Sequence, residues 1–159
     1  MAILKTANGK GKYFNLDARE LVTDYVLRPD KMIHGYCGGV CVDPICPAES
    51  MSLISEQYGK QDGVQLRHFI VSFMPYELSD PAIVNEIAQQ ITTVVGRDYQ
   101  ALYAVHEDKP HLHFHLIHSS VNYHTGARYY GTKREFYAFK NALKGILSLY
   151  GINKLEYVS

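Results

Sequence analysis

Alternating histidines are the most chemically distinctive feature of this sequence of 159 residues. Five of its eight histidines lie between residues 106 and 118, and three of them, His111, His113 and His115, alternate with apolar side chains. A period of two predicts a β-strand whose apolar face packs on a core and whose imidazole face points outward or into a cleft. Neutral imidazole is the commonest protein ligand for transition metals. Imidazoles converging on one side of a sheet therefore favour a metal or phosphate site over solvated surface histidines.

A hairpin is expected to bring His106 next to this strand. Strand-like composition over residues 101–106 and 111–121 flanks Asp108-Lys109-Pro110, which is typical of a turn. A tight turn at this point would place His106 opposite His111. Because His111, His113 and His115 share one face, the alternation alone does not select which of them bind a metal.

The elements that must position the hairpin follow from apolar spacing and from glycine and proline. Strands are expected over residues 1–7, 35–42 and 65–73, the second being a strand or a turn and the third a central strand. Residues 8–11 should break the first strand. Helices are expected over residues 17–28, 49–58, 81–95 and 132–150.

The first of these helices carries a tyrosine near its end. Ala18, Leu21, Val22 and Tyr25 follow the spacing of an amphipathic helix, and the helix should stop before Pro29. Tyr25 is therefore expected in the last turn, on or beside the buried stripe.

The order of the elements predicts an α+β fold. Strands that do not strictly alternate with helices, together with a tight hairpin, favour a central antiparallel β-sheet with helices packed on it. We expect these helices to cover one face of the sheet and the histidines to lie on the other. The length suits a single domain with its own core.

Charge and composition limit the classes of function. The net charge is zero, but residues 123–159 carry a net charge of +4, so a basic C-terminal quarter could hold phosphates. The sequence shows neither a secretory signal nor an apolar run of the roughly 18 residues that a membrane span needs. With three cysteines and no signal, we expect reduced thiols in a cytoplasmic protein.

The histidine pattern resembles a known family motif. His106-x-Asp108-x4-His113-x-His115 resembles the third signature of conjugative relaxases, which are mobilisation nucleases of the HUH endonuclease superfamily. The likeness is greatest to the MOBP type of plasmids and integrative conjugative elements. Residues 119–126 resemble the segment that follows the histidines in these proteins, although Ser119 stands where asparagine is usual.

Two upstream segments extend the resemblance over nearly the whole chain. Residues 22–31 are similar to the first relaxase signature, a helix that bears the catalytic tyrosine, although this signature is looser than the histidine motif. Residues 67–73 are similar to the strand between the two signatures. The tyrosine position falls on Tyr25, with Tyr13 and Tyr36 as alternatives among the thirteen tyrosines.

The resemblance implies a metal-dependent, site-specific endonuclease and strand transferase for single-stranded DNA. The tyrosine attacks a phosphodiester at the nick site of an origin of transfer and stays joined to the 5′ phosphate, and the free 3′ hydroxyl later reverses the reaction. The implied partners are single-stranded or hairpin DNA, accessory transfer proteins and a coupling protein, without membrane insertion. Residues 1–159 would then form one nuclease domain, and the usual continuation of relaxases into further helical regions would make it the N-terminal part of a longer protein.

The resemblance also implies roles for individual residues. The family spacing selects His106, His113 and His115 as ligands of a divalent metal ion, Mn²⁺ or Mg²⁺, with Zn²⁺ and Ni²⁺ as alternatives. A phenol with a pKa of about 10 needs a base or a nearby cation to lose its proton at neutral pH. Asp108 would orient a ligand imidazole or take that proton, and we favour the orienting role.

Contacts with DNA are expected from the basic C-terminal quarter. Arg128, Lys133 and Arg134 are the expected phosphate contacts, together with Lys140. Tyr123, Tyr129 and Tyr130 are the aromatic side chains expected to stack on single-stranded bases.

Three alternative functions remain open at this point. A rolling-circle replication initiator or a transposase would carry a similar histidine motif. A metal-dependent hydrolase of phosphodiesters would work without a covalent intermediate. A non-enzymatic metal- or nucleic-acid-binding module would bind an oligonucleotide without cleaving it.

Overall fold

The computed structural model describes residues 1–7 and 12–158, so the break expected at residues 8–11 lies outside the described residues. Ten elements follow one another: β1 (Ala2–Ala7), α1 (Ala18–Val26), β2 (Met32–Val40), α2 (Pro47–Gln57), β3 (Leu66–Phe73), α3 (Pro81–Val95), β4 (Tyr99–His106), β5 (His113–Asn122), α4 (Lys133–Ser148) and β6 (Leu155–Val158). All four expected helices and all five expected strands are present.

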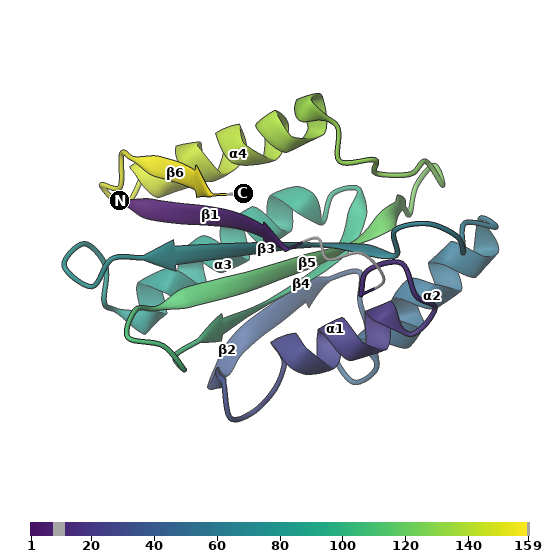
Figure 1. Ribbon diagram of the computed structural model, residues 1–159, viewed down its shortest axis with the longest axis horizontal. Coiled ribbons are helices and arrows are strands. Elements are labelled where there is room, and N and C mark those ends of the chain that lie inside the picture. Colours follow the sequence, from purple (N-terminus) through teal and green to yellow (C-terminus); the bar gives the residue numbers. More distant parts are fainter. Residues whose placement is uncertain (8–11, 159) are drawn as a thin grey trace.

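One sheet of six strands forms the centre of the molecule (Figure 1). Its order is β2-β4-β5-β3-β1-β6, and the first five strands pair antiparallel with their neighbours. The predicted α+β class with a central antiparallel sheet is therefore confirmed. The sixth strand, β6, was not expected, and it pairs parallel to β1 at the edge, which makes the sheet mixed.

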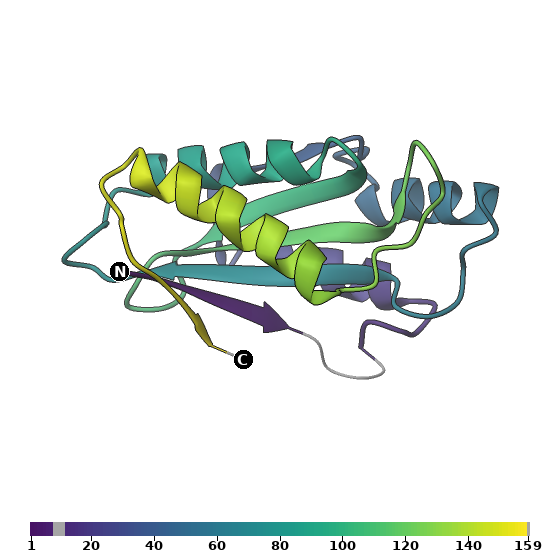
Figure 2. The ribbon, with the colours of Figure 1, turned by 90° about the horizontal axis from the view of Figure 1, so that it is seen from above.

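Helices cover both faces of the sheet, so the prediction of a single covered face was wrong. Helices α3 and α4 lie together on one face (Figure 2), over a core that includes Phe69, Phe114 and Leu116. Helix α1 packs on the opposite face, against Leu102 and Ile117, and α2 lies beside α1. His106, His113 and His115 lie on the α1 face. They are buried because α1 covers the face that was expected to be open.

Helix α1 is fixed on the sheet by a buried stripe and a buried cation. The stripe consists of Ala18, Val22 and Val26, whereas Leu21, which was expected on it, is 57% exposed. On the same side, the Arg19 guanidinium donates hydrogen bonds to Gln65 Oε1 at 2.6 Å and to Ser55 Oγ at 3.0 Å. These contacts tie the first turn of α1 to the chain before β3 and to α2. The other end of α1, which carries Tyr25, is held to the sheet by the contact between the Val26 carbonyl and His106 Nε2.

The β4–β5 hairpin has a longer loop than a tight turn. Residues 107–112 connect the strands, and His106 pairs with His113 rather than with His111. Two residues further along, Ala104 pairs with His115. Because side chains alternate along a strand, this register places His106, His113 and His115 on one face.

Among the described residues, no helix combines the length and the apolar composition that crossing a bilayer requires.

A fifth histidine of the run, His118, belongs to the other face. It is fully buried against Tyr99 and Tyr129 and donates through Nδ1 to the Ser119 carbonyl at 2.8 Å. Burial lowers the pKa of His118 to about 4, with Arg67 also lowering it, while the Ser119 hydrogen bond and Glu135 act in the opposite direction. This imidazole is therefore neutral in the folded protein at pH 7.

The stability of the protein should fall as pH falls because of His118. The unfolded chain takes up a proton at this residue near pH 6.5, whereas the folded protein does so only near pH 4. The contribution is complete above pH 6.5 and is lost below it, by about 2 kcal/mol between pH 7 and pH 5. Urea unfolding of the metal-free protein at both pH values measures this loss. In the His118→Gln variant the loss should be smaller by about that amount, and an unchanged loss would contradict the assignment.

Candidate metal centre

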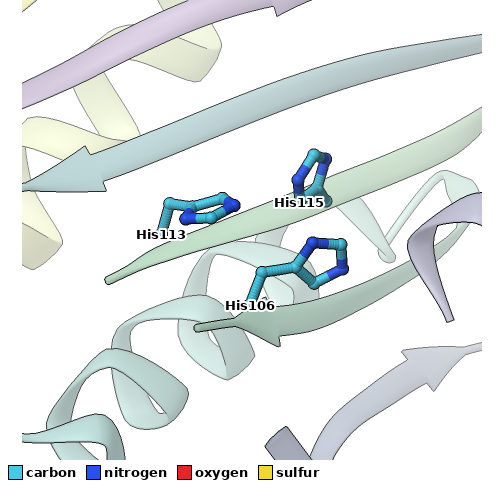
Figure 3. A group of neighbouring side chains, drawn as sticks. All are labelled: His106, His113 and His115. Atoms are coloured by element: carbon cyan, nitrogen blue, oxygen red, sulfur yellow. The ribbon is translucent and has the colours of Figure 1, made fainter. Parts of the chain in front are cut away.

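Three buried histidines form a compact group on the α1 face of the sheet (Figure 3). His106 comes from the end of β4, and His113 and His115 come from the start of β5. Each offers a ring nitrogen within 4.8 Å of the others, and their exposed fractions are 0%, 3% and 3%. The structure thus brings together the three histidines that the spacing selected, and it leaves His111 outside the group.

The hydrogen bonds of His106 leave one ring nitrogen available. Its Nε2 lies 2.6 Å from the carbonyl oxygen of Val26, at the end of α1. A carbonyl only accepts, so Nε2 carries the proton and Nδ1 keeps its lone pair. Nδ1 is buried and has no hydrogen-bond partner in the part of the chain that the structure describes. A buried acceptor without a partner is costly, and a metal ion would satisfy it.

His115 is held by a chain of two further side chains. Its Nδ1 lies 2.7 Å from His68 Nε2, and His68 Nδ1 lies 2.8 Å from the Tyr13 hydroxyl. If His115 binds a metal through Nε2, its proton must sit on Nδ1 and be donated to His68 Nε2. His68 then carries its proton on Nδ1 and donates to the Tyr13 oxygen. Metal binding would therefore determine which atom donates and which accepts in both hydrogen bonds.

Asp108 lies at the rim of the histidine group. One of its carboxylate oxygens is 3.5 Å from His113 Nε2 and 4.0 Å from His106 Nδ1. The other oxygen accepts a hydrogen bond from Lys31 Nζ at 3.1 Å. Burial alone would raise the pKa of Asp108. The hydrogen bond from Lys31, the charge of Lys31 and the charge of His113 together outweigh burial, so the pKa of Asp108 is lowered. The ionised carboxylate therefore holds Lys31 and lies beside His113, while the His106 Nδ1 that it faces has no proton to donate to it.

Burial sets the protonation state of the three histidines. Desolvation lowers the pKa of His106, His113 and His115, and mutual repulsion lowers it further for His113 and His115. All three are therefore neutral at pH 7, which is the form that binds metals. Three neutral imidazoles are suitable ligands for a divalent transition metal ion, and such an ion would also supply a partner for His106 Nδ1.

Tyr25 lies directly beside the group. Its ring centroid is 5.7 Å from that of His115 and 6.3 Å from that of His106. The ammonium groups of Lys12 and Lys31 lie 5.3 Å and 5.4 Å from the same ring. The phenol is half-buried in the last turn of α1, as expected, and the two ammonium groups lie against its ring.

The two alternative tyrosines have other environments. Tyr13 is buried, and burial with the repulsion of Tyr25 raises its pKa to about 12, while its hydroxyl is engaged with His68. Tyr36 packs against the core beneath α3 and α4, away from the histidines. Of the three tyrosines, only Tyr25 is both beside the group and without a hydrogen bond in the described chain.

The basic residues expected to contact DNA lie apart from the histidines. Lys133 and Arg134 are exposed in the first turn of α4, on the opposite face of the sheet. Arg128 is half-buried and pairs with Asp62 at 3.2 Å. Of the tyrosines expected to stack on bases, Tyr130 is exposed, whereas Tyr129 is buried and Tyr123 donates to the Arg97 carbonyl at 2.9 Å.

The sequence analysis missed His68 and Lys31, and it named Tyr13 only as an alternative nucleophile and not as a partner of His68. These three residues come from separate segments, and no spacing rule connects them with the histidine motif. A signal was present for His68, which is a polar residue in a central strand whose other polar residues are Arg67 and Ser72.

A cavity of about 550 Å³ between α1 and α2 contains none of these residues. Five carboxylates line it: Asp17, Glu20, Asp24, Glu49 and Glu56. Their charge would repel a phosphate-bearing ligand, so the chemistry of the histidines, and not the size of the cavity, locates the candidate site.

Comparisons with known proteins agree with this location. A family model described as the MobA/VirD2-like relaxase nuclease domain matches residues 25–152. The match begins at Tyr25 and includes all three histidines of the group.

Curated relatives match parts of the same region. A Protein rlx of Staphylococcus aureus is 40% identical over 78 residues, which are 49% of this chain and 24% of the relative. A second Protein rlx of that species is 30% identical over 99 residues, 62% of this chain and 31% of the relative. The group II intron-interrupted relaxase LtrB of Lactococcus lactis subsp. cremoris is 35% identical over 75 residues, 46% of this chain and 13% of the relative. The chain matches less than a third of the length of each of these relatives.

Replacing His68 should weaken metal binding. His68→Ala removes the acceptor for His115 Nδ1–H, and the loss of such an outer partner typically costs about 10–100-fold in metal affinity. His68→Gln offers a carbonyl oxygen to the same proton and should restore part of the affinity. Calorimetric titration with Mn²⁺ measures both values.

His118→Gln is the matched control, because it alters another buried histidine on the opposite face. It should leave the Mn²⁺ affinity unchanged even if it lowers stability. Equal Mn²⁺ affinities in His68→Ala and the unmodified protein would refute the positioning role of His68.

Proposed function

We propose that this chain, which belongs to the relaxase family through a MobA/VirD2-like nuclease domain, nicks one DNA strand at an origin of transfer by a tyrosine-mediated transesterification. The proposal is carried by one observation: a half-buried tyrosine lies against a buried group of three neutral histidines. The substrate would be single-stranded or hairpin DNA. Accessory transfer proteins and a coupling protein would assist the complete protein.

The three histidines would hold a divalent metal ion. His106 Nδ1, His115 Nε2 and a ring nitrogen of His113 are the donor atoms that the hydrogen bonds leave available or place nearest. When bound, the ion would withdraw charge from a non-bridging oxygen of the scissile phosphate and stabilise the negative charge that develops there. Mn²⁺ and Mg²⁺ are the ions that we propose, with Zn²⁺ and Ni²⁺ as alternatives.

Tyr25 would be the nucleophile. Its Oη would form a bond to phosphorus while the bond to the 3′ oxygen of the preceding nucleotide breaks, which leaves a free 3′ hydroxyl and a 5′-phosphotyrosine. The phenolic proton must leave during this step and the departing 3′ oxygen must gain one, so the protons balance overall. The ammonium groups of Lys12 and Lys31 beside the ring are placed to attract the phosphate backbone to Tyr25. The energy of the phosphodiester is retained, so the 3′ hydroxyl can reverse the reaction.

Asp108 would act through its neighbours and not on the substrate. With its pKa lowered, it remains a carboxylate at neutral pH and is a weak base for a phenol. Its contacts with Lys31 and His113 instead fix the lysine beside Tyr25 and the imidazole beside the metal position. This geometry supports the orienting role over proton abstraction.

A covalent adduct between protein and DNA tests the proposal. Single-stranded oligonucleotides that span the transfer origin of the encoding element are incubated with the protein and Mn²⁺, and a denaturing gel then resolves protein bands carrying DNA. A shifted band should form, and both EDTA and Tyr25→Phe should abolish it, because the first removes the metal and the second removes the attacking oxygen.

Tyr36→Phe is the matched control, since it deletes a hydroxyl on the opposite face and should leave the adduct unchanged. A band that survives in Tyr25→Phe would assign the nucleophile to another tyrosine. Cleavage without any shifted band would favour a hydrolase, and the absence of both would favour a binding module.

A further inference from the structure

Helix α4 lies beside the edge of the sheet that β1 and β6 form, on the face opposite the histidines (Figures 1 and 2). Residues of α4, β1, β3 and β6 line a second cavity. Its volume of about 390 Å³ falls in the roughly 300–1,000 Å³ range typical of small-ligand pockets. Three cations line it, Arg67, Lys133 and Lys140, and none of the described residues lining it is acidic. A cavity of this charge suits an anion.

The aromatic lining adds a second chemical requirement. Tyr129, Phe136, Tyr137 and Tyr157 all line the cavity, together with Phe69 at its base. Lys133, Tyr137 and Lys140 are spaced three or four residues apart, so they project from one side of α4. Tyr137 is 55% exposed, so part of its side chain is accessible to a ligand. Such a mixture of π faces and cations matches a planar ring that carries a phosphate.

The Arg67 side chain is already held in position for a ligand. Its guanidinium lies 5.6 Å from the centroid of the Tyr129 ring, and Gly131 approaches so closely that an added Cβ would lie 2.9 Å from Nη1. Its Nε is buried without a hydrogen-bond partner in the described part of the chain, as is the Oγ1 of Thr6, which also lines the cavity. Buried polar atoms normally find partners, so both atoms indicate a missing acceptor or donor.

The two lysines that line the cavity are also available to bind a ligand. Neither Lys133 nor Lys140 forms an ion pair with a carboxylate within the ranges that the structure describes. Lys140 is half-buried and lines the cavity.

We propose that this cavity binds one nucleotide unit of single-stranded DNA, with the base stacked on the aromatic side chains and its phosphate held by Lys133 and Lys140. This inference rests on the proposed function, which supplies the DNA, and it adds a second contact on the face opposite the histidines. A DNA molecule reaches both places only by passing around an edge of the sheet. The cavity would therefore hold a segment away from the nick site and would tether the strand during cleavage and religation.

Binding of a labelled thymidine oligonucleotide of about 20 nucleotides tests the cationic part of the site. Fluorescence anisotropy is measured in EDTA, so that a metal ion contributes nothing. Lys140→Glu should weaken binding by about tenfold and lower the slope of log affinity against log salt by about 0.7 for each phosphate that the protein no longer neutralises. Lys144→Glu is the matched control, because it makes the same charge change on exposed α4 surface outside the cavity, and it should change affinity by less than about twofold.

A tryptophan placed in the cavity tests the stacking. The chain has no tryptophan, so Tyr137→Trp introduces a single indole whose emission should be quenched when a base stacks on it. Leu149→Trp, at an exposed position outside the cavity, should show no such quenching. Inorganic phosphate should compete only weakly, whereas thymidine monophosphate should compete more strongly because it also carries the base.

The outcomes separate this inference from the proposed function. Equal weakening by Lys140→Glu and Lys144→Glu, or an indole at position 137 that does not respond to the oligonucleotide, would overturn the cavity as a nucleotide site even if the Tyr25 adduct forms. Saturable quenching at position 137 without any adduct would retain the nucleotide site and reject the nicking activity.

Discussion

The register of the β4–β5 hairpin is the constraint on which the site depends. Because side chains alternate along a strand, a shift of one residue would turn His113 and His115 toward α3 and α4 and bring Phe114 to the α1 face. The apolar side of β5 opposes this shift, since Phe114 and Leu116 are fully buried in the core beneath α3 and α4. The same packing that stabilises the sheet therefore fixes the histidine group.

Burial then determines the chemistry of these histidines. An imidazole removed from water must remain neutral and must find hydrogen-bond partners. His106 finds the carbonyl of Val26, and His115 finds His68, which in turn finds Tyr13. In His106 and His115 one ring nitrogen is occupied, and the other remains available. Helix α1 has two roles here, because its last turn supplies both the Val26 carbonyl and the Tyr25 ring.

Periodic patterns account for the parts of the structure that the sequence predicts well. The alternation along β5 separates an apolar face from a histidine face, and the helical spacing of α3 reflects one buried face, so both elements follow from local sequence. That the histidine face of β5 is buried as well does not follow from local sequence, because α1 covers it. The α1 stripe was misplaced at Leu21, because the side of α1 that faces the sheet is chosen partly by Arg19 and its distant partners Gln65 and Ser55. Strand β6 was missed since four residues are too few for a period, and it exists through pairing with β1.

Within the site, too, local sequence patterns predict some residues, whereas residues that join only through tertiary packing are not predicted. His106, His113 and His115 belong to one hairpin, so a motif contains them, and the length of the loop determines which histidine lies opposite His106. A tight turn would have paired His106 with His111, whereas the loop at residues 107–112 pairs it with His113. His68 and Tyr13 reach His115 only through tertiary packing, and a single sequence holds no local record of such contacts.

The uneven distribution of charge over the surface would allow a protein with no net charge to attract a polyanion locally. Five carboxylates gather in the groove between α1 and α2, while uncommitted lysines and Arg67 gather beneath α4. Over distances of about a Debye length, roughly 8 Å at physiological ionic strength, these patches act separately and the zero net charge has little effect. The acidic groove, which follows α1 as far as Asp24, would repel DNA from the side of α1 that faces α2, and Lys12 and Lys31 beside the Tyr25 ring would attract it to that ring. The uneven placement of balanced charges would thus orient a strand toward the tyrosine.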